Sequence, residues 1–289
     1  MHIAISSDIH FLPQWQDKIV CLARTLQAAQ PDLLILAGDV GEPLNMFTRG
    51  LATFQDVCEH RAVIAGNHDV WHRLMTHTSQ HLWESLLEKA ARSYGYTWLD
   101  GENMVLGSLG ICGTIAWYDY GGKPDQFRYD DEFYEAIKPH LSNDGNYIDW
   151  PWTDREFAQR IGEAFEARLD LLEADAAISD VLVVTHVPLY RECVRASRTP
   201  EQEIINAYYA NVGLGKRVLE RTKVRTVISG HVHQHRHLTL RRSNGHHMRN
   251  GGPPPLNVYT IPSDYGQPAA LLLDTETWTA SIVGDTSPR

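Results

Sequence analysis

Five hydrophobic runs in this chain each end in polar side chains of the kind that bind metal ions. They are HIAISSDIH ending at Asp8 and His10, LLILAGD at Asp39, AVIAGNHD at Asn67 and His68, VLVVTH at His186, and TVISGHVH at His231 and His233. Such aliphatic runs, bounded by Gly, Asn, Asp or Ser, are typical of strands buried on both faces. In open α/β sheets the ligand site lies beyond the carboxyl ends of the strands. We therefore expect all five polar clusters to lie on one edge of one sheet.

The types of side chain in these clusters predict a metal site. Two carboxylates, one carboxamide oxygen and four imidazoles, with no thiolate, suit Mn, Fe or Zn better than an iron–sulfur cluster. Seven ligands exceed what one ion needs if it keeps positions open for a substrate. Two divalent ions that share a bridging carboxylate are therefore the simplest interpretation.

In their order and spacing, these motifs resemble those of the calcineurin-like metallophosphoesterases. The matching residues are Asp8-Ile9-His10, Gly38-Asp39, Gly66-Asn67-His68-Asp69, His186 and Gly230-His231-Val232-His233. Each motif alone is weak, but together, each at the end of a strand-like run, they are specific. The resemblance covers residues 1 to about 240. It implies an α/β fold in which two mixed sheets flanked by helices form an α/β/β/α sandwich with a dinuclear metal site at the strand ends.

The resemblance also implies a role for each residue. The first ion would be held by Asp8, His10, Asp39 and His233, and the second by Asp39, Asn67, His186 and His231. A hydroxide bridging the two ions would attack phosphorus in line. His68 would be a catalytic residue that protonates the leaving oxygen or stabilises its charge. Glu42 stands where relatives often place an acidic residue that orients this histidine, although a solvated loop glutamate before Pro43 is an equally good interpretation.

The metal motifs run from residue 8 to residue 233, so any cut between them would split the site. We therefore expect one domain over residues 1–289. Helical spacing of apolar residues predicts helices at 16–30, 45–60 and 79–94, and Thr153 with Glu156 predicts a capping box that opens a further long helix. Short strands are predicted at 236–241, 257–261, 268–274 and 278–283.

Charge and cysteine usage narrow the function classes. A net charge of −10 argues against a general duplex nucleic-acid surface, which needs clustered Lys and Arg. The four cysteines are scattered without a CxxC pair, as in reduced cytosolic proteins. No apolar run approaches the length of a membrane span. We expect a cytoplasmic protein with no membrane partner, and the sequence leaves its oligomeric state open.

Two segments outside the motifs are candidates for determining specificity, and a third is a candidate loop over the site. Residues 117–152 are rich in aromatic and acidic residues, and we interpret them as an insertion that packs on itself or offers an aromatic ring to the substrate. Residues 188–215 contain Arg191, Arg195 and Arg198, which could bind a substrate phosphate or remain on the surface. Residues 243–256 have the composition of a flexible loop that could close over the site. Of the other histidines, His72 and His235 follow active-site motifs closely.

The substrate class is inferred from arginines that are missing. Protein phosphatases and dinucleoside-polyphosphate hydrolases of this superfamily place Arg in or beside the second and third motifs. Here these stretches read Gly38-Asp39-Val40-Gly41-Glu42-Pro43 and Ala65-Gly66-Asn67. A phosphodiesterase acting on a small molecule, of the cyclic-nucleotide or glycerophosphodiester type, is therefore favoured. A phosphomonoesterase or nuclease of the same superfamily and a non-catalytic metal-binding scaffold are the alternatives.

Overall fold

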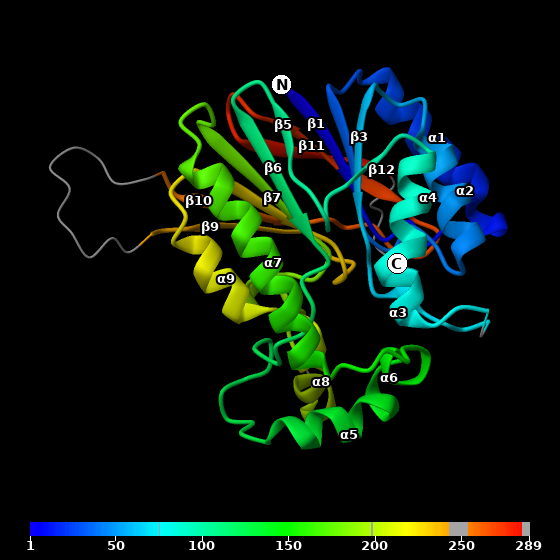
Figure 1. The fold of residues 1–289 in the computed structure, drawn as a ribbon, viewed down its shortest axis with the longest axis vertical. Coiled ribbons are helices and arrows are strands. Elements are labelled where there is room, and N and C mark those ends of the chain that lie inside the picture. The colour runs from blue at the N-terminus through cyan, green and yellow to red at the C-terminus, as the bar shows by residue number, and fades with distance from the viewer. Residues whose placement is uncertain (75, 198, 243–253, 285–289) are drawn as a thin grey trace, which may run out of the picture.

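In the computed structural model, residues 1–74, 76–197, 199–242 and 254–284 are described. Two six-stranded mixed sheets face each other between layers of helices (Figure 1). The first sheet has the order β12 (Thr279–Gly284), β11 (Ala269–Asp274), β1 (His2–Ser6), β2 (Leu33–Ala37), β3 (His60–Ile64) and β4 (Thr97–Trp98). The second has the order β5 (Met104–Leu106), β6 (Leu109–Thr114), β7 (Asp180–Thr185), β8 (Val224–Ser229), β10 (Leu256–Thr260) and β9 (Arg236–Leu240). The expected α/β/β/α sandwich is confirmed.

The central strands of both sheets run parallel, and the antiparallel pairs lie toward the edges. Strands β1 to β4 are mutually parallel, as are β6, β7, β8 and β10, whereas β11, β12, β5 and β9 pair antiparallel with their neighbours. Because parallel strands end on the same side, their following loops gather at one end of the sandwich.

Alternation along the strands divides the core into layers. Ile3 and Ile5 belong to a cluster that combines side chains of both sheets, whereas Ala4 belongs to the cluster that includes the helices. Side chains of this inter-sheet cluster include Ile35 and Ile64 from the first sheet and Leu182, Val184 and Ile228 from the second. Both faces of the central strands are thus buried, which is why their sequences read as continuous apolar runs.

Helices cover the outer faces of the two sheets (Figure 1). On the first sheet these are α1 (Gln16–Ala28), α2 (Leu44–Phe54), α3 (Ser79–His81), a π-helical turn over Leu82–Leu86, and α4 (Leu87–Ser93); on the second they are α7 (Asp154–Ala174) and α9 (Val212–Leu219). The helix expected over 45–60 ends at Phe54, and the last residue of that range, His60, begins β3. The capping box of α7 is confirmed: Thr153 and Glu156 each accept a hydrogen bond from the other's backbone N–H.

Three short helices gather at the end toward which the parallel strands point. Helices α5 (Asp131–Leu141), α6 (Asp144–Tyr147) and α8 (Pro200–Ile205) lie together at the bottom of Figure 1. Helices α5 and α6 belong to the aromatic segment 117–152. Four of its ten aromatic side chains are buried, among them Trp117 and Tyr134, five are half-buried, and Tyr129 is 48% exposed. Packing within this segment therefore explains most of its aromatic composition.

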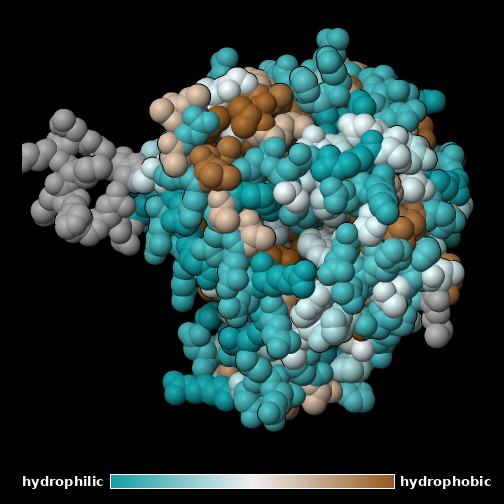
Figure 2. Space-filling model, viewed as in Figure 1, coloured by the Kyte–Doolittle hydropathy of each residue, from teal (hydrophilic) through white to brown (hydrophobic). Residues whose placement is uncertain are grey.

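The surface seen in Figure 2 is mainly hydrophilic. Its largest hydrophobic patch lies over β5 and β6, where Val105 of the short edge strand β5 is 51% exposed. Within the described residues, no helix combines the length and the apolar character that crossing a bilayer requires.

Candidate functional site

The predicted metal ligands lie in loops that follow parallel strands of both sheets. Asp8 and His10 follow β1, Asp39 follows β2, and Asn67 follows β3, all in the first sheet; His186 follows β7, and His231 and His233 follow β8, both in the second. The expectation of one edge of one sheet was therefore wrong. Strands β5 to β10 form a sheet of their own, and the two sheets face each other with their carboxyl ends together.

The backbone at this site is held in a conformation that residues other than glycine seldom adopt. Asp8, His10, Asp39, His231 and His233 all have positive φ, from 39° to 67°. For a residue with a Cβ atom, this conformation costs about 1–2 kcal/mol. Such strain tends to gather at functional sites, where the surrounding fold enforces it.

Two motif glycines are required by the close approach of these loops. A Cβ atom on Gly66 would lie 2.1 Å from Oδ1 of Asp39, and one on Gly230 would lie 2.5 Å from Oδ2 of Asp8. Any larger residue would displace a carboxylate. The positions before Asn67 and His231 therefore require glycine, because only glycine leaves room for the ligands of the neighbouring strands.

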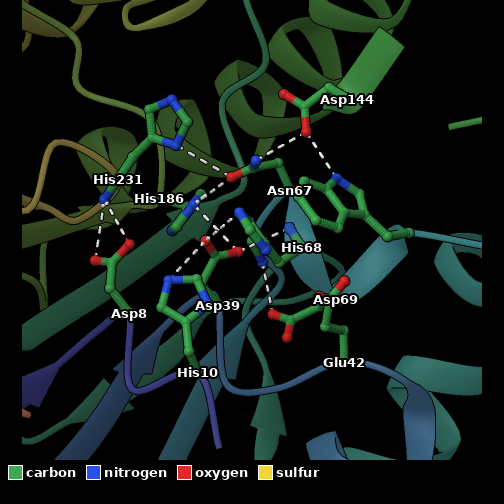
Figure 3. Close-up of polar contacts among 12 residues, drawn as sticks. Asp8, His10, Asp39, Glu42, Asn67, His68, Asp69, Asp144, His186 and His231 are labelled. Atoms are coloured by element: carbon green, nitrogen blue, oxygen red, sulfur yellow. Dashed lines mark hydrogen bonds and ion pairs between the residues drawn. The ribbon is translucent and has the colours of Figure 1, made fainter. Parts of the chain in front are cut away.

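The first group of ligands brings lone pairs together (Figure 3). Oδ1 of Asn67 lies 2.9 Å from Nε2 of His186 and 3.1 Å from Nδ1 of His231. Nδ1 of His186 faces the Ala37 carbonyl at 3.0 Å, and Nε2 of His231 faces the Tyr208 carbonyl at 3.0 Å. A carbonyl only accepts, so these ring nitrogens carry the protons. In neutral rings, the two nitrogens that face Asn67 are then unprotonated.

Three acceptors at such distances repel one another unless a positive charge lies among them. The carboxylate of Asp39 is also close, with Oδ1 3.4 Å from Nε2 of His186. Burial lowers the pKa of His186, but the charge and hydrogen bond of Asp39, the charge of Asp8 and the Ala37 carbonyl together raise it to about 10. A second proton on His186 therefore supplies the positive charge in the metal-free protein. A divalent ion bound by the same four residues would replace it.

The ligand atoms of the second group lie farther apart than those of the first. Nε2 of His10 lies 3.7 Å from Oδ2 of Asp39, and Nε2 of His233 lies 3.7 Å from Oδ1 of Asp8. Asp8, His10 and His233 offer ligand atoms that all lie within 4.8 Å of one another. Nε2 of His10 is buried and has no hydrogen-bond partner among the described residues. This nitrogen is therefore available as a metal ligand in the site.

These distances fit metal ions. Ligand bonds of about 2.0–2.2 Å place neighbouring donor atoms of a tetrahedral or octahedral ion roughly 3.0–3.5 Å apart. The observed separations, from 2.9 Å between His186 and Asn67 to 3.7 Å between His10 and Asp39, lie close to that range. The residues present therefore suit N/O-ligated divalent ions, and Asp39 contributes one oxygen to each group.

His68 lies beside both groups of ligands, but it is not one of the acceptors that gather around Asn67. Its ring stacks on Trp71 with centroids 3.7 Å apart, and its Nε2 lies 3.9 Å from Oδ2 of Asp39. The hydroxyl of Tyr265 lies 3.4 Å from the same nitrogen. With 14% of its side chain exposed, His68 reaches the pocket above the ligands.

Glu42 forms an ion pair with Arg73, with Oε1 2.7 Å from Nη1. Among the described residues, no hydrogen bond joins Glu42 to His68. Burial raises the pKa of Glu42, whereas the nearby His68 and Arg73 lower it. A role of Glu42 in orienting the His68 ring stays a prediction.

The three candidate arginines differ in position. Arg195 lines the pocket, and its Nε donates to the Val232 carbonyl at 2.9 Å. Arg191 forms an ion pair with Asp125 at 2.9 Å and does not line this pocket. Arg198 and most of the 243–256 loop lie outside the described residues. The side chain of His235 binds the Thr260 carbonyl, and the backbone N–H of His72 binds the Tyr147 carbonyl.

Two buried carboxylates support the site but were not singled out from the sequence. Asp69 accepts hydrogen bonds from the backbone N–H groups of Gly41 and Gly66, which tie the loops after β2 and β3 together. Asp144, from α6, accepts one from the amide of Asn67 at 2.9 Å. Asp69 could have been suspected because it completes the third motif. No local signal distinguishes Asp144 from the other acids of its segment.

A pocket of about 370 Å³ opens above the ligands. Its wall combines site residues with aromatic and apolar side chains, namely Trp71, Leu141, Ile205, Tyr208, Tyr209 and Tyr265. Arg195 is the only lysine or arginine among its described lining residues. The pocket is therefore sized for part of a small molecule and carries little fixed positive charge of its own.

Comparisons with known proteins agree with this geometry. A sequence model of the family described as calcineurin-like phosphoesterase matches residues 1–235. Comparison with curated proteins gives no match. The solved phosphopantetheinyl hydrolase of Mycobacterium tuberculosis superposes with a TM-score of 0.68 at 18% identity, over 91% of this chain and 89% of that one. A dimetal phosphatase from Danio rerio gives a TM-score of 0.51 at 13% identity, over 94% of this chain and 95% of that one. At these identities the likeness is one of fold.

Proposed function

Because this chain belongs to the calcineurin-like phosphoesterase family, we propose that it is a dinuclear metal-dependent phosphodiesterase that acts on a small molecule. The cyclic-nucleotide and glycerophosphodiester types are the leading substrate classes. The observation that supports this proposal best is the convergence of acceptors around Asn67, whose oxygen faces two imidazole nitrogens at 2.9 and 3.1 Å. This arrangement is favourable only around a positive charge.

We assign one ion to Asp8, His10, Asp39 and His233, and the other to Asp39, Asn67, His186 and His231. Bound divalent ions of the Mn, Fe or Zn type would lower the pKa of water and neutralise charge on a phosphoryl group. The protein fixes the ligands beforehand: Asp8 is fully buried and Asp39 is 1% exposed. Fixed donors of this kind need little reorganisation during a reaction.

His68 is the group that we assign to the leaving oxygen. It borders the pocket, and the stacking of its ring on Trp71 restricts its orientation. A proton on Nε2 would be within reach of a leaving group bound above the ligands. The Tyr265 hydroxyl, 3.4 Å from that nitrogen, is placed to help orient it.

The preference for a diester follows from the charge of the pocket. A monoester brings a second negative charge, for which guanidinium groups are the usual partners. Arg195 is the one such group among the described lining residues, and its Nε is already used by the Val232 carbonyl. A diester carries a single charge and needs fewer cationic contacts.

Two further features support a small substrate in the cytoplasm. The net charge of −10 disfavours duplex nucleic acid, and with it the nuclease alternative. All four cysteines are free thiols, as expected in a reducing compartment. The full ligand set speaks against a non-catalytic scaffold.

A comparison of p-nitrophenyl phosphate with its bis ester, at equal metal loading and pH, tests the proposal. We expect a higher kcat/KM for the diester. A clear monoester preference would move the protein to the phosphomonoesterase alternative and make Arg195 the next residue to substitute. No turnover of either ester in protein loaded with Mn²⁺ would favour the scaffold.

A further inference from the structure

A second cavity adjoins the metal pocket. It has a volume of about 690 Å³ and shares Arg195, Ile205, Tyr209 and His233 with that pocket. A molecule bound at the metal ligands can therefore extend into it past these shared residues. The other residues of its wall are Ala196, Ser197, Gln202, Asn206, Gln234 and Arg236.

The charge of this cavity is opposite to that of the protein as a whole. Its described lining includes two guanidinium groups, Arg195 and Arg236, and no carboxylate. The chain carries a net charge of −10. A cavity lined by one sign of charge concentrates ions of the other sign.

Arg236 is also unpaired. It begins strand β9, and Nε of its guanidinium is buried without a hydrogen-bond partner among the described residues. No ion pair joins it to any described carboxylate, whereas Arg191, Arg217, Arg221 and Arg225 each have one. A buried donor left without a partner is unfavourable, and more so when the group is charged. A ligand that accepts hydrogen bonds from Arg236 would remove this cost.

We propose that this cavity is a substrate subsite that binds an anionic group, a carboxylate or a phosphate, at the far end of one arm of the diester. Arg236 provides its main contact, and Arg195 lies between the subsite and the metal pocket. The neutral amides of Gln234 and Asn206 in the wall are suited to a polar arm. This inference rests on the proposed function, and it narrows the substrate to diesters that carry a second negative charge.

Matched substrates test the subsite. In a series of p-nitrophenyl alkyl phosphate diesters of graded arm length, the arm ends either in a carboxylate or in a carboxamide of the same shape. At the arm length that reaches Arg236, we expect the carboxylate to have a kcat/KM roughly 10-fold to 100-fold higher, as for one charge-assisted hydrogen-bonded pair. Arg236→Gln should remove this preference by lowering the kcat/KM of the carboxylate substrate to that of the carboxamide.

Arg241→Gln is the matched control, because Arg241 is exposed just beyond the end of the same strand. It should keep the carboxylate preference. If wild-type protein shows no preference at any arm length, or if the Arg236 and Arg241 variants behave alike, the subsite is wrong.

A binding measurement separates this inference from the proposed function. In metal-free protein the carboxylates of the metal site repel anions, so inorganic pyrophosphate should bind at the subsite. Calorimetry should show binding that Arg236→Gln weakens about tenfold or more and Arg241→Gln leaves unchanged. That result in a protein without diesterase activity would overturn the proposed function and leave the anion site standing. Equal pyrophosphate affinity in all three proteins would overturn the subsite.

Discussion

The carboxylate of Asp144 accepts a hydrogen bond from the amide nitrogen of Asn67 at 2.9 Å, which turns the amide oxygen toward His186 and His231 (Figure 3). The same carboxylate accepts hydrogen bonds from the indole of Trp71 and the hydroxyl of Tyr118, each at 2.7 Å. A side chain from the segment between β6 and α7 thus fixes which atom of Asn67 faces the metal site. It also anchors the tryptophan on which His68 stacks.

Asp144→Asn should therefore weaken metal binding. The introduced amide would offer one acceptor oxygen where the carboxylate offers two, so Asn67 would no longer be held in one orientation. Loss of a group that orients a metal ligand typically costs 10-fold to 100-fold in affinity. Competition with a chelator measures the affinity directly. Asp131→Asn, in the exposed ion pair of the same segment with Arg155, is the control, and equal affinity in both variants would contradict the role of Asp144.

Asp39→Ala should release both ions, because Asp39 contributes Oδ1 near His186 and Oδ2 near His10. Elemental analysis of the purified variant counts ions per chain. His72→Ala is a suitable control, since His72 follows the third motif but its side chain has no hydrogen bond or ion pair among the described residues, and its backbone N–H donates to the Tyr147 carbonyl. Two ions retained in the Asp39 variant would mean that this carboxylate does not bridge.

The candidate ligand motifs could be recognised in the sequence because the residues of each motif are adjacent in the chain. A buried strand and the polar loop that follows it are contiguous, so Asp8, Asp39 and Asn67 could be predicted to lie close together. The late strands were likewise placed to within a residue, as for β10 and β11. Alternating and continuous apolar patterns depend on neighbours close in sequence.

The parts that sequence reasoning missed depend on contacts between distant segments. Division of the strands into two sheets follows from packing over the whole chain. Asp144 reaches Asn67 across 77 positions, and Tyr265 stacks on His10, with centroids 4.0 Å apart, from beyond the last motif. Glu42 could be placed near His68 by analogy, but its pairing with Arg73 at 2.7 Å was not foreseen, since that arginine lies in a loop with no periodic pattern.

Arg168 of α7 links the helix to both sheets, and Arg168→Lys should destabilise the fold. Its guanidinium donates to the carbonyls of Leu99 and Asp100, which follow β4, and of Gly113, in β6. A lysine has fewer donors and no planar fork, so carbonyls would be left unsatisfied. We expect a loss of about 2 kcal/mol in the free energy of unfolding, measured by urea denaturation. Arg160→Lys, whose side chain is 56% exposed, should change it by about 0.5 kcal/mol or less.

Asp100 gives a prediction for the dependence of stability on pH. It joins the two sheets by accepting hydrogen bonds from the backbone N–H groups of Ala65 and Ile115. Burial raises the pKa of Asp100 to about 6, although these hydrogen bonds and Arg168 lower it. The folded state therefore holds this proton more tightly than the unfolded chain, whose pKa is about 3.9. The stabilisation is fully present below about pH 4 and is lost as the pH rises through about 6.

The difference in unfolding free energy between wild type and Asp100→Asn should accordingly be larger near pH 4 than near pH 7. Urea titrations of metal-free protein at several pH values measure it, and the absence of metal removes any contribution from loss of ions. If this difference in unfolding free energy stays constant or increases with pH, burial does not raise the pKa of Asp100.

His68→Ala should keep the metal ions and lose turnover. His68 is not among the seven residues assigned to the two ions, so metal content should match that of the wild type. A general acid contributes typically 10²–10⁴-fold, and it matters most when the leaving oxygen is basic. We therefore expect a small loss of kcat/KM for diesters that release nitrophenolate and a large one for those that release an alkoxide. If the loss were equal across a leaving-group series, His68 would be positioning the phosphoryl group, because only proton transfer depends on the basicity of the oxygen that departs.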